Sequence, residues 1–77
     1  MKIKIFTTPT WAYCHQLKEF LSEKGLTYEE FDVARDPQAL DEMVRISGKR
    51  AIPTTLIDND VIIGFDQEKI EKRISRK

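Results

Sequence analysis

Cysteine and histidine are scarce in this sequence, which contains one of each among its 77 residues, Cys14 and His15. A single thiol excludes an intramolecular disulfide, and these two residues cannot supply the four cysteine or histidine ligands of a structural zinc site. Long hydrophobic runs are absent as well, so we expect neither a membrane span nor a signal peptide. We therefore expect a cytoplasmic protein without membrane contact, in a compartment that keeps thiols reduced.

The sequence also has no net charge, because 13 lysine and arginine residues balance 13 aspartate and glutamate residues. Without an overall positive field there is no electrostatic reason to expect binding to nucleic acid or to a membrane surface. The length suits one small domain over residues 1–77. We expect a monomer, with a dimer linked through Cys14 under oxidising conditions as the weaker alternative.

Hydrophobic periodicity divides the chain into predicted strands and helices. Alternation predicts strands over Lys2–Phe6, Thr27–Val33, Thr54–Ile57 and Val61–Ile63. Helical spacing predicts helices over Ala12–Lys24, over Pro37–Ser47 and after Asp66, the last one carrying Ile70 and Ile74. This β-α-β-α-β-β-α order predicts an α/β fold in which three helices cover a four-stranded mixed sheet.

Capping residues and apolar stripes support the predicted helices. We expect Thr10 and Asp36 to begin the first two helices, and Gly25 and Gly48 to end them. The apolar stripe of the first helix is predicted to consist of Tyr13, Leu17, Phe20 and Leu21, and that of the second of Leu40, Met43 and Val44.

The segment Thr7–Lys18 carries the candidate chemistry, since it joins the first strand to the first helix and contains the only cysteine. Unpaired N–H groups and the positive end of the helix dipole favour thiolate over thiol at a helix start, so Cys14 could be unusually reactive. The alternative is a buried cysteine that acts as a small hydrophobic residue. His15 points about 100° around the helix from Cys14, and we expect it to be solvated rather than to act as a base.

Three motifs, in matching order and spacing, resemble the glutaredoxin family of small thioredoxin-fold proteins over essentially the whole chain. The first is Thr7–Thr10 leading into Tyr13, Cys14 and Lys18. The second, Gly48–Thr54 (GKRAIPT), is similar to the family's Gly-x-Arg-x-Val-Pro segment with its cis proline. The third, Ile63–Asp66 (IGFD), is similar to the glycine-containing turn before the last helix.

The resemblance implies a redox mechanism and a defect in it. In the family the first cysteine of a Cys-Pro-Tyr-Cys motif attacks a disulfide, and the second resolves the mixed disulfide. The resemblance places Trp11 at the attacking cysteine, Ala12 at the proline and Cys14 at the resolving cysteine. It implies a thiol–disulfide oxidoreductase acting on disulfides or glutathione mixed disulfides, impaired in this chain. The family's monothiol mechanism and its iron–sulfur binding also use the first cysteine, so neither is expected.

Three explanations of Trp11 stay open. It can be a natural loss that leaves a non-catalytic module for binding thiol peptides or glutathione, or an engineered block. It can also mark a recoding event, because tryptophan's UGG codon is one base from UGA, which some redoxins use for selenocysteine, and one base from both cysteine codons. An unambiguous UGG in the native genome would exclude the third explanation.

The resemblance also implies a substrate groove, formed by Tyr13, Ile52, Pro53, Gly64, Phe65 and Asp66. A cis peptide before Pro53 would leave the backbone of Ile52 free to pair with an extended thiol peptide. N–H groups around Phe65 and Asp66 would hold a carboxylate of glutathione.

No bound cofactor is expected, with glutathione as a candidate co-substrate and a disulfide-containing protein as the substrate. Electrons would come from glutathione or from a thioredoxin-type reductase. The choice stays open because a Gly-Phe turn replaces the paired glycines of classical glutaredoxins, as in the glutaredoxin-like hydrogen donors of ribonucleotide reductase.

Overall fold

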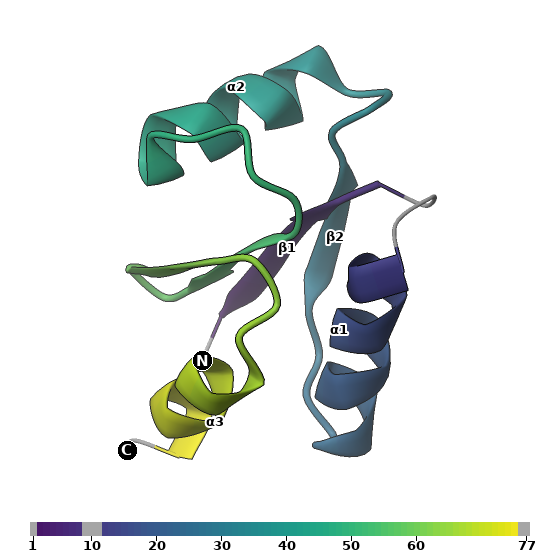
Figure 1. Ribbon diagram of the computed structural model, residues 1–77, viewed down its shortest axis with the longest axis vertical. Coiled ribbons are helices and arrows are strands. Elements are labelled where there is room, and N and C mark those ends of the chain that lie inside the picture. The colour runs from purple at the N-terminus through teal and green to yellow at the C-terminus, as the bar shows by residue number, and fades with distance from the viewer. Residues whose placement is uncertain (1, 9–11, 76–77) are drawn as a thin grey trace.

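Four strands form one mixed sheet in the order β2-β1-β3-β4. Strand β1 (Ile3–Thr7) pairs in parallel with β2 (Glu29–Asp32) and antiparallel with β3 (Thr54–Ile57), and β3 pairs antiparallel with β4 (Asp60–Ile63). Figure 1 shows this computed structural model, which describes residues 2–8 and 12–75. The predicted cap Thr10 and the candidate site residue Trp11 lie outside the described residues.

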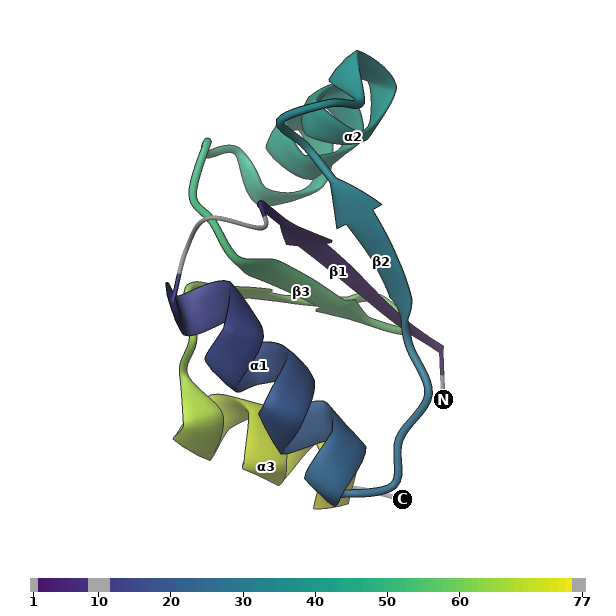
Figure 2. The same cartoon turned by 90° about the vertical axis from the view of Figure 1, so that its right-hand side faces the viewer.

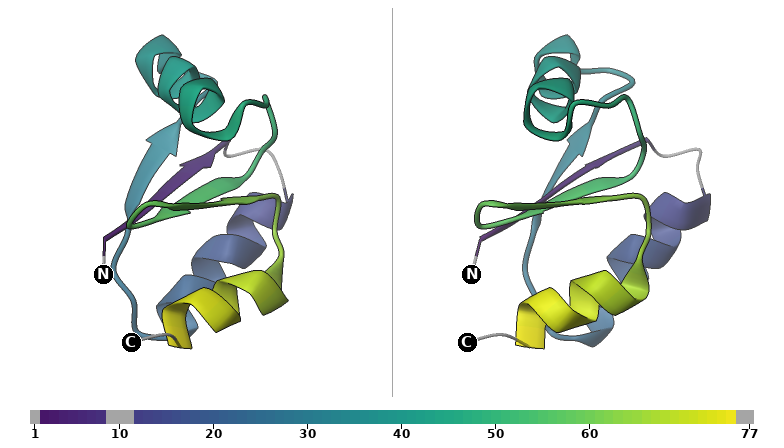
Figure 3. Two further views of the ribbon diagram at one scale, coloured as in Figure 1. Left: turned by 90° about the vertical axis from the view of Figure 1, so that its left-hand side faces the viewer. Right: turned by 60° about the vertical axis from the view of Figure 1, so that its left-hand side comes forward.

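The helices cover both faces of the sheet. Helices α1 (Ala12–Glu23) and α3 (Gln67–Ser75) lie on one face, and α2 (Pro37–Ser47) lies on the other (Figures 2 and 3). The predicted fold class and element order are therefore confirmed. Within residues 2–8 and 12–75, none of the helices combines the length and the apolar character that crossing a membrane requires.

Alternation along β1 divides the buried side chains between two cores. Ile3 and Ile5 pack with α1 and α3, whereas Phe6 packs on the α2 side, where its ring stacks on Phe31 with centroids 5.3 Å apart. The first core also contains Leu17, Phe20, Leu21, Ile57, Ile62 and Ile70, and the second contains Val33, Ala39 and Met43. The sheet thus separates the layer that holds Cys14 from the layer that holds α2.

The second strand is shorter than the sequence predicts. Strand β2 covers only Glu29–Asp32 of the expected range 27–33, and its pairs with β1 run from Lys4, opposite Glu29, to Thr7, opposite Asp32. The predicted bounds of β1, β4 and α1 are each one residue off, and those of β3 and α2 are correct.

Helix α2 begins and ends as its capping residues predict. The Asp36 carboxylate accepts the N–H groups of Gln38 and Ala39 at 3.1 and 3.3 Å. At the other end Gly48 adopts a φ of 74° that favours glycine, and its N–H donates to the Val44 carbonyl at 2.7 Å. Of the residues predicted to face inward, Met43 is buried, while Leu40 and Val44 are half-buried.

Replacing the cap tests its share of the stability. Asp36→Ala removes the acceptor of two N–H groups, and we expect the free energy of unfolding, measured by urea denaturation, to fall by about 1 kcal/mol. The control is Asp41→Ala, an exposed residue of the same helix, which should change it by less than about 0.5 kcal/mol. Equal losses in the two variants would contradict the capping role.

Candidate redox site

The three motifs meet at one end of the sheet. Pairing places Phe6 opposite Thr54 and Thr54 opposite Ile63, so the end of β1, the start of β3 and the end of β4 lie side by side. The N–H of Gly64 donates to the carbonyl of Pro53 at 2.7 Å, which joins the second motif to the third. Helix α1 begins at the same end (Figure 2). Segments far apart in the sequence therefore form one surface.

The proline turn has the predicted cis peptide between Ile52 and Pro53. The Thr54 hydroxyl donates to the Ala51 carbonyl at 2.7 Å across this turn. Among the described residues, the N–H and carbonyl of Ile52 pair with no other backbone group. A bend whose backbone has no backbone partner among the described residues therefore lies where the sequence predicts the docking edge.

The glycine turn positions Phe65 and Asp66. Gly64 has a φ of 79°, which residues with a side chain rarely adopt. Phe65 packs on the first core, where its ring meets Phe20 edge-to-face with centroids 6.2 Å apart. Asp66 caps α3, since its carboxylate accepts the Lys69 N–H at 3.1 Å. That N–H is thus occupied by the chain's own carboxylate, while the predicted contact of this turn with a glutathione carboxylate stays a prediction.

Cys14 is buried, with 1% of its surface exposed. Burial raises the pKa of its thiol, although the backbone N–H of Thr8 and the charge of Lys18 lower it; the charge of Glu30 adds to the rise. The expectation that the helix start would favour the thiolate is not met, because loss of hydration is the largest influence on this thiol and raises its pKa. The alternative, a buried cysteine within the apolar stripe, describes Cys14 better.

Tyr13 does not belong to the apolar stripe of α1. It is 56% exposed, and Cys14 takes its place with Leu17, Phe20 and Leu21. Successive residues point about 100° apart on a helix, so burial of Cys14 turns Tyr13 outward. This places the phenol on the surface at the start of α1. His15 is exposed, as predicted.

A polar cluster between α1 and the sheet escaped the sequence analysis. The Glu30 carboxylate oxygen Oε2 accepts the Thr7 hydroxyl and the Lys18 ammonium, both at 3.0 Å. Burial would raise the pKa of Glu30, but these hydrogen bonds outweigh it and lower the pKa. One signal was present in the sequence, since Lys18 lies four residues after Cys14. The other determinant is the sheet register, which pairs Glu30 with Ile5, whose side chain faces α1.

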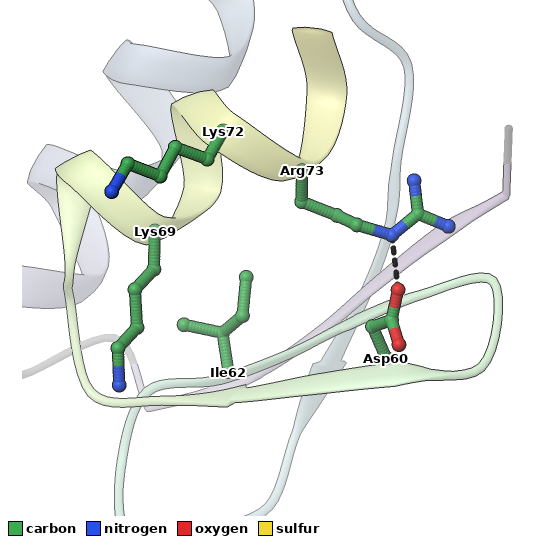
Figure 4. A pocket seen from close by; sticks show the side chains of 5 residues that line it. All are labelled: Asp60, Ile62, Lys69, Lys72 and Arg73. Carbon is green, nitrogen blue, oxygen red and sulfur yellow. Dashed lines mark hydrogen bonds and ion pairs between the residues drawn. The ribbon is translucent and has the colours of Figure 1, made fainter. Parts of the chain in front are cut away.

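A surface pocket of about 230 Å³ lies between β4 and α3. Its lining residues are Asp60, Ile62, Lys69, Lys72 and Arg73 (Figure 4). Arg73 bonds to Asp60 and, at 3.1 Å, to Asp58, so its charge is neutralised by the hairpin. None of the lining residues belongs to the predicted groove.

Comparison with known proteins assigns the chain to a family. The family model described as Glutaredoxin matches residues 3–62. The chain belongs to the glutaredoxin family. This glutaredoxin is 35% identical over 74 residues to an uncharacterized glutaredoxin-like 8.6 kDa protein in the rubredoxin operon of Clostridium pasteurianum, covering 96% of this chain and 99% of the relative.

Two solved structures place this glutaredoxin among redoxins of different kinds. The glutaredoxin-like protein NrdH-redoxin from Escherichia coli, described by its thioredoxin-like activity profile, is 29% identical with a TM-score of 0.82, over 94% of this chain and 93% of that one. A buckwheat glutaredoxin in complex with glutathione is 18% identical with a TM-score of 0.75, over 96% and 70%. The second likeness shows the fold alone.

One active-site cysteine is missing from this glutaredoxin, since Cys14 is its only cysteine. The structure buries the remaining thiol at the end where the motifs meet. Among the described residues, no group of three or more histidine, cysteine, aspartate or glutamate side chains could hold a metal ion.

Because the pKa of Cys14 is raised, the free energy of unfolding should fall as the pH rises in the alkaline range. Above about pH 8.5 an unfolded thiol releases its proton while folded Cys14 keeps it, so the free energy of unfolding falls as pH rises toward the folded pKa. Cys14→Ala lacks this titration, and its stability from pH 8 to 10 should fall less steeply in urea denaturation. Parallel profiles would contradict the raised pKa.

Proposed function

We propose that this glutaredoxin is a thiol–disulfide oxidoreductase whose attacking position is occupied by Trp11, so that turnover is impaired. The carrying observation is the burial of its single thiol at the site end of α1. Burial and a raised pKa suit the resolving cysteine of a pair better than the attacking one, because the attacking group must be an exposed thiolate.

The electron balance shows why a second thiol matters. Reducing a disulfide takes two electrons, which two thiols supply by forming a disulfide with each other. A lone Cys14 thiolate can only displace one half of the substrate and remain bound to the other half as a mixed disulfide. An outside thiol, such as glutathione, must then attack that bond and release Cys14. A buried thiol makes both steps slow.

The docking surface supports a disulfide or thiol peptide as the substrate. The backbone of Ile52 is unpaired within the described chain, and the exposed Tyr13 ring lies at the site end of α1. An extended peptide could add to this edge through its main chain, with Pro53 and Gly64 below it. Phe65 and Asp66 would border the far side of the same groove.

A second candidate function is a non-catalytic module that binds glutathione or thiol peptides. The observation that favours it is that the cis-proline turn at Ile52 and Pro53 is present, whereas one of the two active-site cysteines is missing. The electron donor of the redox function, glutathione or a thioredoxin-type reductase, is part of the proposal. Both donors are kept because one structural neighbour is a complex with glutathione and another is described by a thioredoxin-like activity profile.

Restoring the attacking thiol tests the redox function. Trp11→Cys should raise disulfide reductase activity at least about tenfold over the native chain, because a helix-start cysteine ionises near neutral pH. The assay runs with glutathione and glutathione reductase, and separately with thioredoxin reductase, which identifies the donor. In the control, Trp11→Cys combined with Cys14→Ser should lose the gain on protein disulfide substrates. Equal activity in the native chain and Trp11→Cys would mean that Cys14 acts alone.

Binding without turnover is tested by titrating the native chain with S-methylglutathione and following its amide NMR signals. The thioether cannot exchange with Cys14, so only docking is observed. We expect shifts at Tyr13, Ile52 and Gly64, with none at Asp58, which lies in the hairpin at the opposite end of β3. Signals that stay unchanged at high ligand concentration would contradict glutathione binding. Shifts spread evenly over the chain would show non-specific association.

A further inference from the structure

The polar cluster of Thr7, Lys18 and Glu30 lies in the same layer as Cys14. One carboxylate oxygen of Glu30 receives both other side chains at 3.0 Å. Thr7 is buried, and the side chains of Lys18 and Glu30 are only 26% and 38% exposed. Thr7 on β1 and Glu30 on β2 thus hold the Lys18 ammonium, which projects from α1, in one direction. A freely solvated ion pair would not hold it in this way.

The cluster is coupled to the thiol through α1 and β1. Lys18 follows Cys14 by one helical turn, so both side chains lie on the same side of α1. Thr8, the neighbour of Thr7, donates its backbone N–H to the Cys14 sulfur. Among the described residues, the charges that act on this sulfur come from Lys18 on α1 and Glu30 on β2, while His15 acts on Glu30. Thr7, the last residue of β1, contributes a hydroxyl to this cluster, and Thr8, which follows the strand, contributes an N–H group.

We infer that Lys18 is a positioning residue for the redox step: Glu30 and Thr7 hold its ammonium in the layer of Cys14, where it offsets the negative charge of the thiolate. This inference rests on the proposed function. Lys18 acts through its charge and forms no bond with the substrate. Glu30 has two opposed effects, since it fixes Lys18 in place and its own charge disfavours the thiolate.

The step that Lys18 assists is the release of Cys14 from a mixed disulfide. An incoming thiolate attacks the partner sulfur, the sulfur–sulfur bond breaks, and its electron pair stays on Cys14. The incoming thiol is oxidised into the new disulfide, and Cys14 is reduced to a buried thiolate. That charge forms in a poorly hydrated layer, where a nearby ammonium stabilises a thiolate more strongly than it would in water. The thiolate then takes a proton from solvent.

Opposite effects of Lys18 and Glu30 distinguish this role from packing. A purely structural cluster would loosen in the same way whichever member is removed. A charge effect predicts that Lys18→Met disfavours the Cys14 thiolate. Glu30→Gln should favour it, because glutamine keeps an oxygen that can accept the Lys18 and Thr7 hydrogen bonds and loses only the negative charge. Lys18→Arg keeps the charge and should restore native behaviour. Lys24→Met is the matched control, because Lys24 directly follows α1 and pairs with Glu71 of α3 at 3.2 Å.

The experiment follows the ¹³Cβ signal of Cys14 against pH in the native chain and these variants. The single cysteine gives one resonance, which reports the thiolate directly and needs no access to the buried sulfur. We expect the thiolate fraction at a fixed pH below the pKa to fall about threefold to tenfold in Lys18→Met and to rise in Glu30→Gln. Lys18→Arg and Lys24→Met should stay near the native titration.

Shifts of the same sign in Lys18→Met and Glu30→Gln, or a native titration in Lys18→Met, would overturn the inference. If Lys18→Met does not fold, Glu30→Gln decides alone, since a thiolate fraction that does not rise contradicts the charge effect. The titration needs no turnover, so its outcome does not depend on the reductase assay. If the thiolate fraction shifts in opposite directions in the two variants but Trp11→Cys is inactive, the proposed function is overturned. If all variants titrate like the native chain and Trp11→Cys is active, only the role of Lys18 is overturned.

Discussion

Strand β1 is the constraint on which the rest of the molecule depends. It is hydrogen-bonded on both sides, to β2 and to β3, so the direction of each of its side chains is fixed. Ile5 then points into the layer of α1 and Phe6 into the layer of α2. Its last residue, Thr7, reaches the polar cluster, and its pairing with β3 brings the proline turn to the same end as Cys14.

At Cys14 two general effects compete, and burial wins. The N-terminus of a helix favours an anion by a few tenths to about 1 kcal/mol at exposed sites, and the effect falls off within a turn. Removing a thiolate from water costs more unless specific groups replace its hydration. Here Thr8 and Lys18 replace part of it, and Glu30 works against them. The thiol is therefore a reluctant nucleophile whose reactivity depends on neighbouring charges.

The sequence was sufficient for the fold and for the turns, and insufficient for side-chain directions around Cys14. Asp36 and Gly48 each favour a local geometry that the sequence predicts, and the cis peptide before Pro53 was expected from the family resemblance. All three behave as predicted. Tyr13 was misplaced because a tyrosine and a cysteine are both acceptable on an apolar stripe, and only packing against the sheet decides between them. The contact of Glu30 with Lys18 depends on the register of β2 against β1, which hydrophobic pattern alone leaves undefined.

The separation of the two cores by the sheet has a consequence for how this fold can diverge. Phe6, Ala39 and Met43 form their cluster on the face opposite Cys14, with none of its members among the buried residues of the other cluster. Substitutions at well-separated sites change stability nearly additively. The α2 layer can therefore accumulate sequence drift, and be compensated, with little effect on the layer that holds the thiol. Substitutions on one face of this sheet can therefore arise largely independently of substitutions on the other face.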